Sequence, residues 1–256
     1  MISAANYRPV DWNSIHSGEY VYEVGCWKTC DGGFCCKHDH PDFDFQFLPK
    51  NGSVIMYMED EYHYFAKRGQ VSSTPAQKIT LDFGGPRPLV VYHVFCGLLG
   101  RCDGVMEKPF LCKIYPFMPI LGAQGELESL WHASIFELTF ELVKSKTPCT
   151  VFNKLESYKK LWTDNPRILD PLRHPYVVFY LQAIKYFSRS YEKTLLARSD
   201  LMRKSGKEFW SEWEIAYLRG ELFDLDEIKY ELSKVYRDLS QTYGDFLAPV
   251  HELPVA

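Results

Sequence analysis

The sequence predicts an α+β protein, in which a small, irregular, cysteine-rich part with short strands is followed by a helical region. Two observations favour this fold class. Short apolar runs broken by glycine and proline occupy residues 1–124, together with seven of the eight cysteines. After Gly125, apolar residues recur every three or four positions, which is typical of amphipathic helices. We therefore expect two parts, residues 1–124 and 125–256, packed together as one globular unit.

Five strands and one helix are expected in the first part. Residues 42–47 alternate strictly between polar and apolar, so their three phenylalanines would share one face. A helix is expected over residues 59–68, because Gly69 is well placed to stop it. A buried strand would end at Cys96. The expected strands are residues 19–24, 42–47, 53–57, 78–83 and 89–95.

The second part is expected to be helical. Pro175 suits the first position of a long helix. The expected helices are residues 126–145, 152–162 and 175–204, and a last one with Ile228, Leu232, Val235, Leu239 and Tyr243 on one face. We interpret these apolar stripes as core or interface packing rather than as a cofactor site. The same interpretation applies to Trp210 and Trp213.

Composition limits the classes of function. With 256 residues and 46% hydrophobic content, the chain can fill a core without disulfides. The net charge of -4 combines both signs, so a basic face for nucleic acid is not supported. The apolar run at residues 88–96 is too short to cross a bilayer, and the first nine residues do not resemble a signal peptide. We expect a cytoplasmic protein without a membrane partner, in which cysteines are ligands or catalysts; the alternative is a secreted, disulfide-bonded domain.

The cysteines form two dense groups, and seven of them are candidate metal ligands. Thiolates must converge on an ion, and Gly32 and Gly33 let the backbone curl around it. The first group is Cys26, Cys30, Cys35 and Cys36, and the second is Cys96, Cys102 and Cys112. Such a site would be split between residues 26–36 and 96–112, so metal binding should contribute to folding. Cys149 stands apart, and we interpret it as a small buried apolar residue.

Seven thiols exceed the four ligands of one structural zinc. Cys35 and Cys36 are hard to place on a single ion, because adjacent side chains tend to point apart. An iron–sulfur cluster that leaves three cysteines over, or two zinc ions sharing a thiolate, are the alternatives. His38 and His40 are candidate catalytic residues, either as acid–base groups or as further ligands, and the alternative is a solvated polar loop. We interpret His93 as a core histidine.

The cysteine spacing also resembles that of a known family. The chain has a cluster that ends in the pair Cys35-Cys36, then later cysteines, then a segment with Pro109, Cys112, Tyr115 and Pro116. This pattern resembles the CxxCxxCC family, described as a zinc- or iron-chelating domain, over residues 26–117. The gaps in the first cluster are longer than the family's, and lysines at 108 and 113 stand where its arginines are common. The resemblance implies metal chelation more securely than any reaction, although the flagellin lysine methylase branch, which also appends a long tail, suggests an iron–sulfur protein with an enzymatic role.

Familiar nucleotide-binding and hydrolase motifs are absent from the sequence, including GxGxxG, the Walker loop, HExxH and GxSxG. Our leading hypothesis is a metal-binding enzyme with an iron–sulfur cluster or multinuclear iron centre, acting on an unknown small-molecule or protein substrate. One coordination position would be open to substrate, and His38 or His40 would assist proton transfer. The alternatives are a structural zinc protein with a protein-interaction role, and a metal carrier or sensor.

Overall fold

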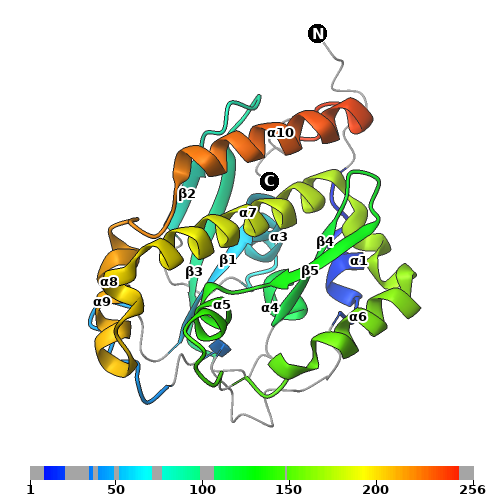
Figure 1. The fold of residues 1–256 in the computed structure, drawn as a ribbon. Helices are drawn as coiled ribbons and strands as arrows, with labels where there is room; N and C mark the ends of the chain where they lie inside the picture. The colour runs from blue at the N-terminus through cyan, green and yellow to red at the C-terminus, as the bar shows by residue number, and fades with distance from the viewer. Residues whose placement is uncertain are drawn as a thin grey trace.

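The computed structural model describes residues 9–20, 35–36, 40–48, 52–70, 77–98, 107–147 and 149–247. Helices outweigh strands in this part of the chain, and the strands form two small antiparallel sheets, which confirms the predicted α+β class (Figure 1). The described helices and strands are α1 (Trp12–Ser17), β1 (Ser53–Met58), α3 (Glu59–Lys67), β2 (Gln77–Leu81), β3 (Leu89–Cys96), α4 (Phe110–Ile114), β4 (Phe117–Leu121), β5 (Leu127–His132), α5 (Ile135–Leu142), the 3-10 helix η3 (Phe152–Lys154), α6 (Leu155–Asp164), the 3-10 helix η4 (Pro166–Arg173), α7 (Pro175–Ala197), α8 (Ser199–Met202), α9 (Gly206–Leu218) and α10 (Leu225–Tyr243).

The larger sheet has the strand order β1-β3-β2, and both neighbours of β3 are antiparallel to it. This sheet and α3 confirm the three strands and the helix expected at residues 53–57, 78–83, 89–95 and 59–68. The pairing of β1 with β3 places Cys96 opposite Ser53. Gly52 approaches this point closely, because a Cβ there would lie 2.6 Å from the Cys96 carbonyl oxygen, and its φ is 155°. A side chain would not fit at Gly52, so the end of β3 is closely packed where the chain reaches Cys96.

The second sheet is the hairpin of β4 and β5, which the sequence did not predict. The single helix expected over residues 126–145 is wrong, because its first part forms β5 and only its second part is helical, as α5. Gly125, with a φ of 79°, makes the turn between the two strands. Ser134 then starts α5 by accepting a hydrogen bond from the Phe136 N–H at 3.1 Å. Ser134 therefore divides the apolar pattern of residues 126–145, which looked like one helix, into a strand and a helix.

The strand expected over residues 42–47 is also wrong, because this segment has no regular structure. Phe45 is buried but Phe47 is 69% exposed, so the phenylalanines do not share a buried face. Three successive backbone N–H groups, at residues 46–48, donate to the carboxylate of Glu214 on α9 at 2.7 to 2.8 Å. The backbone of this segment therefore pairs with a side chain instead of with a neighbouring strand.

The central helix is α7, which packs against β4, α5 and α10 and crosses the middle of the molecule in Figure 1. The expected helix over residues 152–162 and the expected last helix are confirmed as α6 and α10. The helix expected over residues 175–204 ends at Ala197 and is followed by the short α8. The sequence did not predict α1, α4 or α9. Of the strand expected over residues 19–24, only the first two residues are described, and neither is in a strand.

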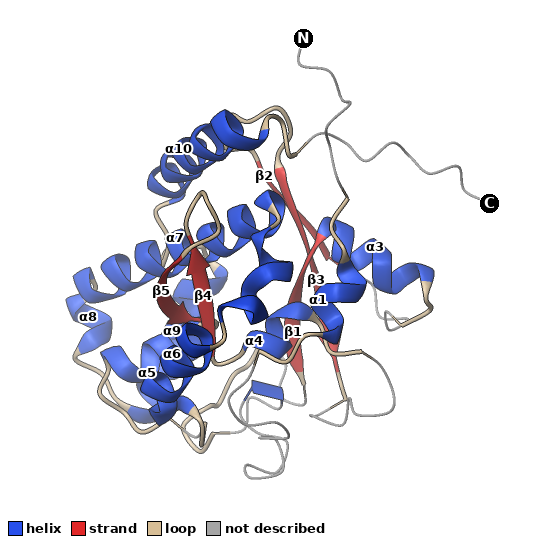
Figure 2. Ribbon diagram, turned by 90° about the vertical axis from the view of Figure 1, so that its right-hand side faces the viewer, coloured by secondary structure: helices blue, strands red, loops and turns tan. Residues whose placement is uncertain are grey.

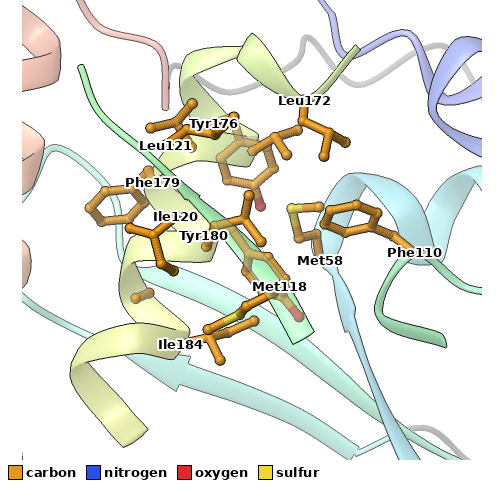
Figure 3. Close-up of a cluster of buried hydrophobic side chains, with 14 of the residues drawn as sticks. Met58, Phe110, Met118, Ile120, Leu121, Leu172, Tyr176, Phe179, Tyr180 and Ile184 are labelled. Atoms are coloured by element: carbon orange, nitrogen blue, oxygen red, sulfur yellow. The ribbon is translucent and has the colours of Figure 1, made fainter. Parts of the chain in front are cut away.

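One hydrophobic core joins both sheets to α7. Figure 3 shows side chains from β1, α4, β4 and α7 meeting there, among them Met58, Phe110, Met118, Ile120, Phe179 and Tyr180. The core draws on both sides of position 124, and α4 contacts both β1 and β4, between the two sheets (Figure 2). A second core packs Phe45 with side chains of α5, α7 and α9. Within the described ranges, none of the helices combines the length and the apolar character that crossing a membrane requires.

Candidate metal centre

The structure places four of the seven candidate ligands, and they come from three segments. Cys35 and Cys36 are helical, Cys96 ends β3, and Cys112 lies in α4. All four are half-buried. The other predicted site residues, Cys26, Cys30, Cys102 and His38, lie outside the described residues.

The four described thiols come from distant parts of the sequence, and electrostatic effects on their pKa values link them. Sγ of Cys35 lies 3.7 Å from Sγ of Cys36. This hydrogen bond and burial raise the pKa of the Cys35 thiol well above its usual value, and the negative charges of Cys36, Glu137 and Cys112 raise that pKa further. Burial, and then the charge of Cys36, raise the pKa of Cys96.

The segment that carries Cys112 is held in place by other residues. At the start of α4, Glu61 Oε1 accepts a hydrogen bond from the Phe110 N–H at 2.6 Å. Lys113 Nζ donates to the carbonyl oxygens of His16 and Gly18 at 2.5 and 2.7 Å. β3, which carries Cys96, is held by strands on both sides. Two of the three thiol-bearing segments are thus fixed by ordinary protein contacts.

Glu61 and His16 form a buried pair beside α4. The distance from His16 Nε2 to Glu61 Oε1 is 3.6 Å. Burial raises the pKa of Glu61 to about 8, against hydrogen bonds from the Phe110 and Met58 backbone that lower it. Burial likewise lowers the pKa of His16 to about 4. Both side chains are therefore neutral at pH 7, and the contact is not an ion pair.

Glu137 is the candidate functional residue that sequence reasoning missed. It lies in the first turn of α5, is 0% exposed, and neither carboxylate oxygen has a hydrogen-bond partner in any other described residue. Burial raises its pKa to about 8, against a hydrogen bond from its own backbone N–H that lowers it. The available signal was a charged residue inside the apolar run of residues 135–140. A buried acid without donors calls for a structural or functional explanation.

His40 packs on α5, one turn from Glu137. Its ring centroid lies 5.0 Å from that of Phe140 and 5.2 Å from that of Phe43. Its Nδ1 accepts the Asp42 N–H at 3.2 Å, and Asp42 Oδ2 lies 3.8 Å from the same nitrogen. In the neutral ring the proton then sits on Nε2, so this atom can donate a hydrogen bond or a proton.

His93 and Cys149 occupy other places in the fold. His93 lies three residues before Cys96 on β3, so its side chain points to the opposite face of the sheet. Burial lowers the pKa of His93, as it does for histidines in protein cores. Cys149 precedes η3, where its carbonyl oxygen accepts the Phe152 N–H at 3.3 Å. Their interpretation as structural residues stays a prediction.

Among the described residues, no three His, Cys, Asp or Glu side chains are placed as the ligands of one metal ion. The donor types nevertheless suit a metal, because thiolates are soft ligands found in iron–sulfur and zinc sites. Cys35 and Cys36, with sulfur atoms 3.7 Å apart, therefore offer donors of the kind that an iron or zinc centre uses.

Comparisons of the chain with protein-family models, with curated proteins and with solved structures give no significant match. A function must therefore be inferred from the residues themselves. The features that call for one are the four half-buried thiols and the buried carboxyl of Glu137.

Proposed function

We propose that the chain is a cytoplasmic metal-binding enzyme that holds an iron–sulfur cluster or a multinuclear iron centre. The supporting observations are the 3.7 Å separation of the Cys35 and Cys36 sulfur atoms, and the effect of the charge of Cys112 on the pKa of Cys35 and of Cys36 on that of Cys96. Core packing gives no reason for such a density of thiols, because apolar side chains fill such space at lower cost. A metal centre does require this grouping.

The number of donors favours more than one metal ion. In this proposal Cys26, Cys30 and Cys102 join the four described thiols, which makes seven ligands. The resemblance to the CxxCxxCC family supports metal chelation, and its flagellin lysine methylase branch supports an iron–sulfur enzyme. The bound iron would supply redox or Lewis-acid chemistry. His40, together with His38, would hold or release a proton beside it, and the substrate would be a small molecule or a protein.

A structural zinc site with a protein-interaction role is the second candidate. The same convergence favours it, because an ion there would tie residues 35–36 to β3 and α4. However, β3 is already fixed by its neighbouring strands, and α4 by Glu61 and Lys113. A purely structural ion would add little to these contacts. A metal carrier would present exposed thiolates, whereas the four described thiols are half-buried.

Purification without air, followed by metal and acid-labile sulfide analysis, tests the proposal. We expect iron, with visible charge-transfer absorption from thiolate to iron. Cys36→Ser and Cys96→Ser should lose most of the iron. Cys149→Ser, the matched control, should retain it. Stoichiometric zinc without iron would favour the second candidate, and a protein without any metal would overturn both.

A further inference from the structure

We propose that Cys35 and Cys36 are a reversible redox pair, which a small-molecule disulfide oxidises to a disulfide between these two neighbouring residues. The structure shows both residues as free thiols. Their sulfur atoms are in contact, because Sγ of Cys35 lies 3.7 Å from Sγ of Cys36. Formation of this disulfide does not depend on the function proposed above, whereas its consequence for metal loading does.

The first support is the short distance over which the two sulfur atoms have to move. In a disulfide they lie about 2.05 Å apart, so a shift of about 2 Å closes the observed separation. Residues 35 and 36 are helical, and side chains of adjacent residues on a helix do not face each other. The contact between the sulfur atoms is therefore a feature of this site and does not follow from adjacency alone.

The hydrogen bond between the thiols prepares the first step of the oxidation. When Cys35 donates its S–H to Sγ of Cys36, it stabilises the negative charge of the Cys36 thiolate. This thiolate attacks one sulfur atom of the small-molecule disulfide. A mixed disulfide forms on Cys36, and the other half of the reagent leaves as a thiolate.

The neighbouring thiol completes the reaction. Sγ of Cys35 attacks Sγ of Cys36, so the bond between the two residues forms and the second half of the reagent leaves. The two protons of the protein thiols pass to the two thiolates that have left. The protein pair thereby loses two electrons, and the reagent gains them as it is reduced to two thiols.

Only one of the two thiols has to be accessible to the reagent, because the second step takes place within the protein. Both residues are half-buried, so each keeps part of its surface in contact with solvent. Structural cysteines that are sealed in a core are inert, whereas reactive cysteines are partly exposed. The burial of this pair therefore suits a reactive site.

Strain makes the oxidised pair easy to reduce again. Neighbouring Cα atoms are about 3.8 Å apart, whereas the Cα atoms of ordinary disulfides are separated by roughly 4.4 to 6.8 Å. Strained disulfides are more readily reduced, and they are the labile and regulatory ones. We therefore expect a switch rather than a permanent cross-link. In the oxidised state neither sulfur is a thiolate, so the proposed metal centre would lose two of its ligands.

Trypsin allows a direct test, because cleavage after the lysines on either side releases residues 29–37 as one peptide. This peptide also holds Cys30, so the test uses Cys30→Ser, in which Cys35 and Cys36 are its only thiols. The folded, metal-free, full-length variant is equilibrated with oxidised glutathione, the remaining thiols are alkylated, and the peptide is analysed by mass spectrometry. We expect a peptide without alkyl groups that is lighter than the reduced peptide by two hydrogen atoms. An excess of reduced glutathione should restore both thiols.

Cys35→Ser and Cys36→Ser, each combined with Cys30→Ser, are the matched controls. Each keeps one thiol of the pair, so the reaction should stop at the mixed disulfide and the peptide should carry one glutathione. These adducts would show that the second step needs the neighbouring sulfur. Two free thiols or two glutathione adducts in the equilibrated Cys30→Ser peptide would overturn the proposal, and so would a cross-link from this peptide to another cysteine.

Reversibility and folding have their own checks. A disulfide that an excess of reduced glutathione fails to open would contradict a switch. Should Cys30→Ser fail to fold, the wild-type peptide decides in the same way, because its only adduct should then be on Cys30.

Iron loading separates this inference from the proposed function. In wild-type protein loaded with iron without air, we expect the bound metal to protect the pair from oxidised glutathione. The oxidised metal-free protein should take up iron only after reduction. Equal iron uptake by the oxidised and reduced protein would contradict the consequence for metal loading. A wild-type protein that binds no iron would end the proposed function, while the peptide masses would still decide whether the redox pair exists.

Discussion

Two buried glutamates in the second core differ in the hydrogen bonds that their carboxyl groups accept. Glu214 on α9 is 1% exposed, and its carboxylate accepts three backbone hydrogen bonds from residues 46–48. Glu137 on α5 is 0% exposed and accepts none from any other described residue. Burial alone therefore does not identify a functional acid. The difference lies in the donors: Glu214 fastens a loop to a helix, whereas Glu137 is left without a partner that the fold supplies.

Glu61 lies between these extremes. It is fully buried like Glu137, but it accepts the Phe110 N–H and so helps to fix the start of α4. Its second oxygen has no partner among the described residues. From Glu214 through Glu61 to Glu137, the carboxyl group accepts fewer and fewer hydrogen bonds from other residues. Removing each carboxyl in turn tests what these hydrogen bonds contribute to stability.

The largest expected effect comes from Glu214→Ala. This change leaves three backbone N–H groups without their charged acceptor and should lower the free energy of unfolding by about 3 kcal/mol. Urea denaturation of the metal-free protein measures the loss. Glu208→Ala on the same helix, where the side chain is 68% exposed, should change stability by less than about 0.5 kcal/mol. A loss below about 1 kcal/mol for Glu214→Ala would mean that water replaces the carboxylate at residues 46–48.

The next effect is a dependence of stability on pH. Burial raises the pKa of Glu61 and of Glu137 from 4.5 to about 8. Between these values the folded protein keeps a proton that the unfolded chain has released, so stability falls as pH rises. From pH 6.5 to 8, each carboxyl should contribute a loss of about 1.5 kcal/mol.

Urea denaturation of the metal-free protein across this pH range checks that prediction. Glu61→Gln and Glu137→Gln should each flatten the profile, and Glu208→Gln should not. His16, whose pKa is lowered to about 4, acts with the opposite sign, but only between pH 4 and 6.5. A profile that stays equally steep in both Gln variants would show that these carboxyls are ionised in the folded protein.

The smallest expected effect comes from Tyr191→Phe, because Tyr191 contacts both the helix that carries Glu137 and the helix that carries Glu214. The Tyr191 hydroxyl bonds to Thr139, two residues from Glu137, and accepts the Trp213 Nε1–H at 2.7 Å, next to Glu214. Its loss leaves the buried Trp213 donor unpaired and should cost about 1 kcal/mol. Chemical denaturation measures this. A loss of stability close to zero would show that water satisfies the Trp213 Nε1–H in the variant.

The larger sheet and most helices could be predicted because their patterns are local. The run that became β3 is apolar except for His93, and Asp224 caps α10 by accepting the Glu227 N–H at 3.0 Å. The strand predicted over residues 42–47 was wrong for the opposite reason, because the backbone partner of this segment is Glu214, which is far away in the sequence. The helix predicted over residues 127–132 was wrong because leucines and a tryptophan at helical spacing also suit a strand, which here pairs with β4.

The candidate site shows the same division between local and distant information. Cysteine density marked Cys35, Cys36, Cys96 and Cys112 from sequence alone, and their role as ligands stays a prediction. Glu137 could not be found in this way. One glutamate on a helix normally faces solvent, and only the packing of α5 against α7 and α9 shows that this one does not. His40 was marked by its position after the cysteines, and its contact with Phe140 again depends on the fold.

The wide spread of these residues along the chain has a consequence for biosynthesis. The described thiols lie between positions 35 and 112, and the segment that carries Cys96 is in place only after β1 has paired with β3. Contacts between such distant segments form late in folding. During translation, the first thiols would emerge from the ribosome well before their later partners. If the proposed function is correct, a cell that makes this protein must load metal after α4 has been synthesised, and must shield the early cysteines from stray metal ions and oxidants until then.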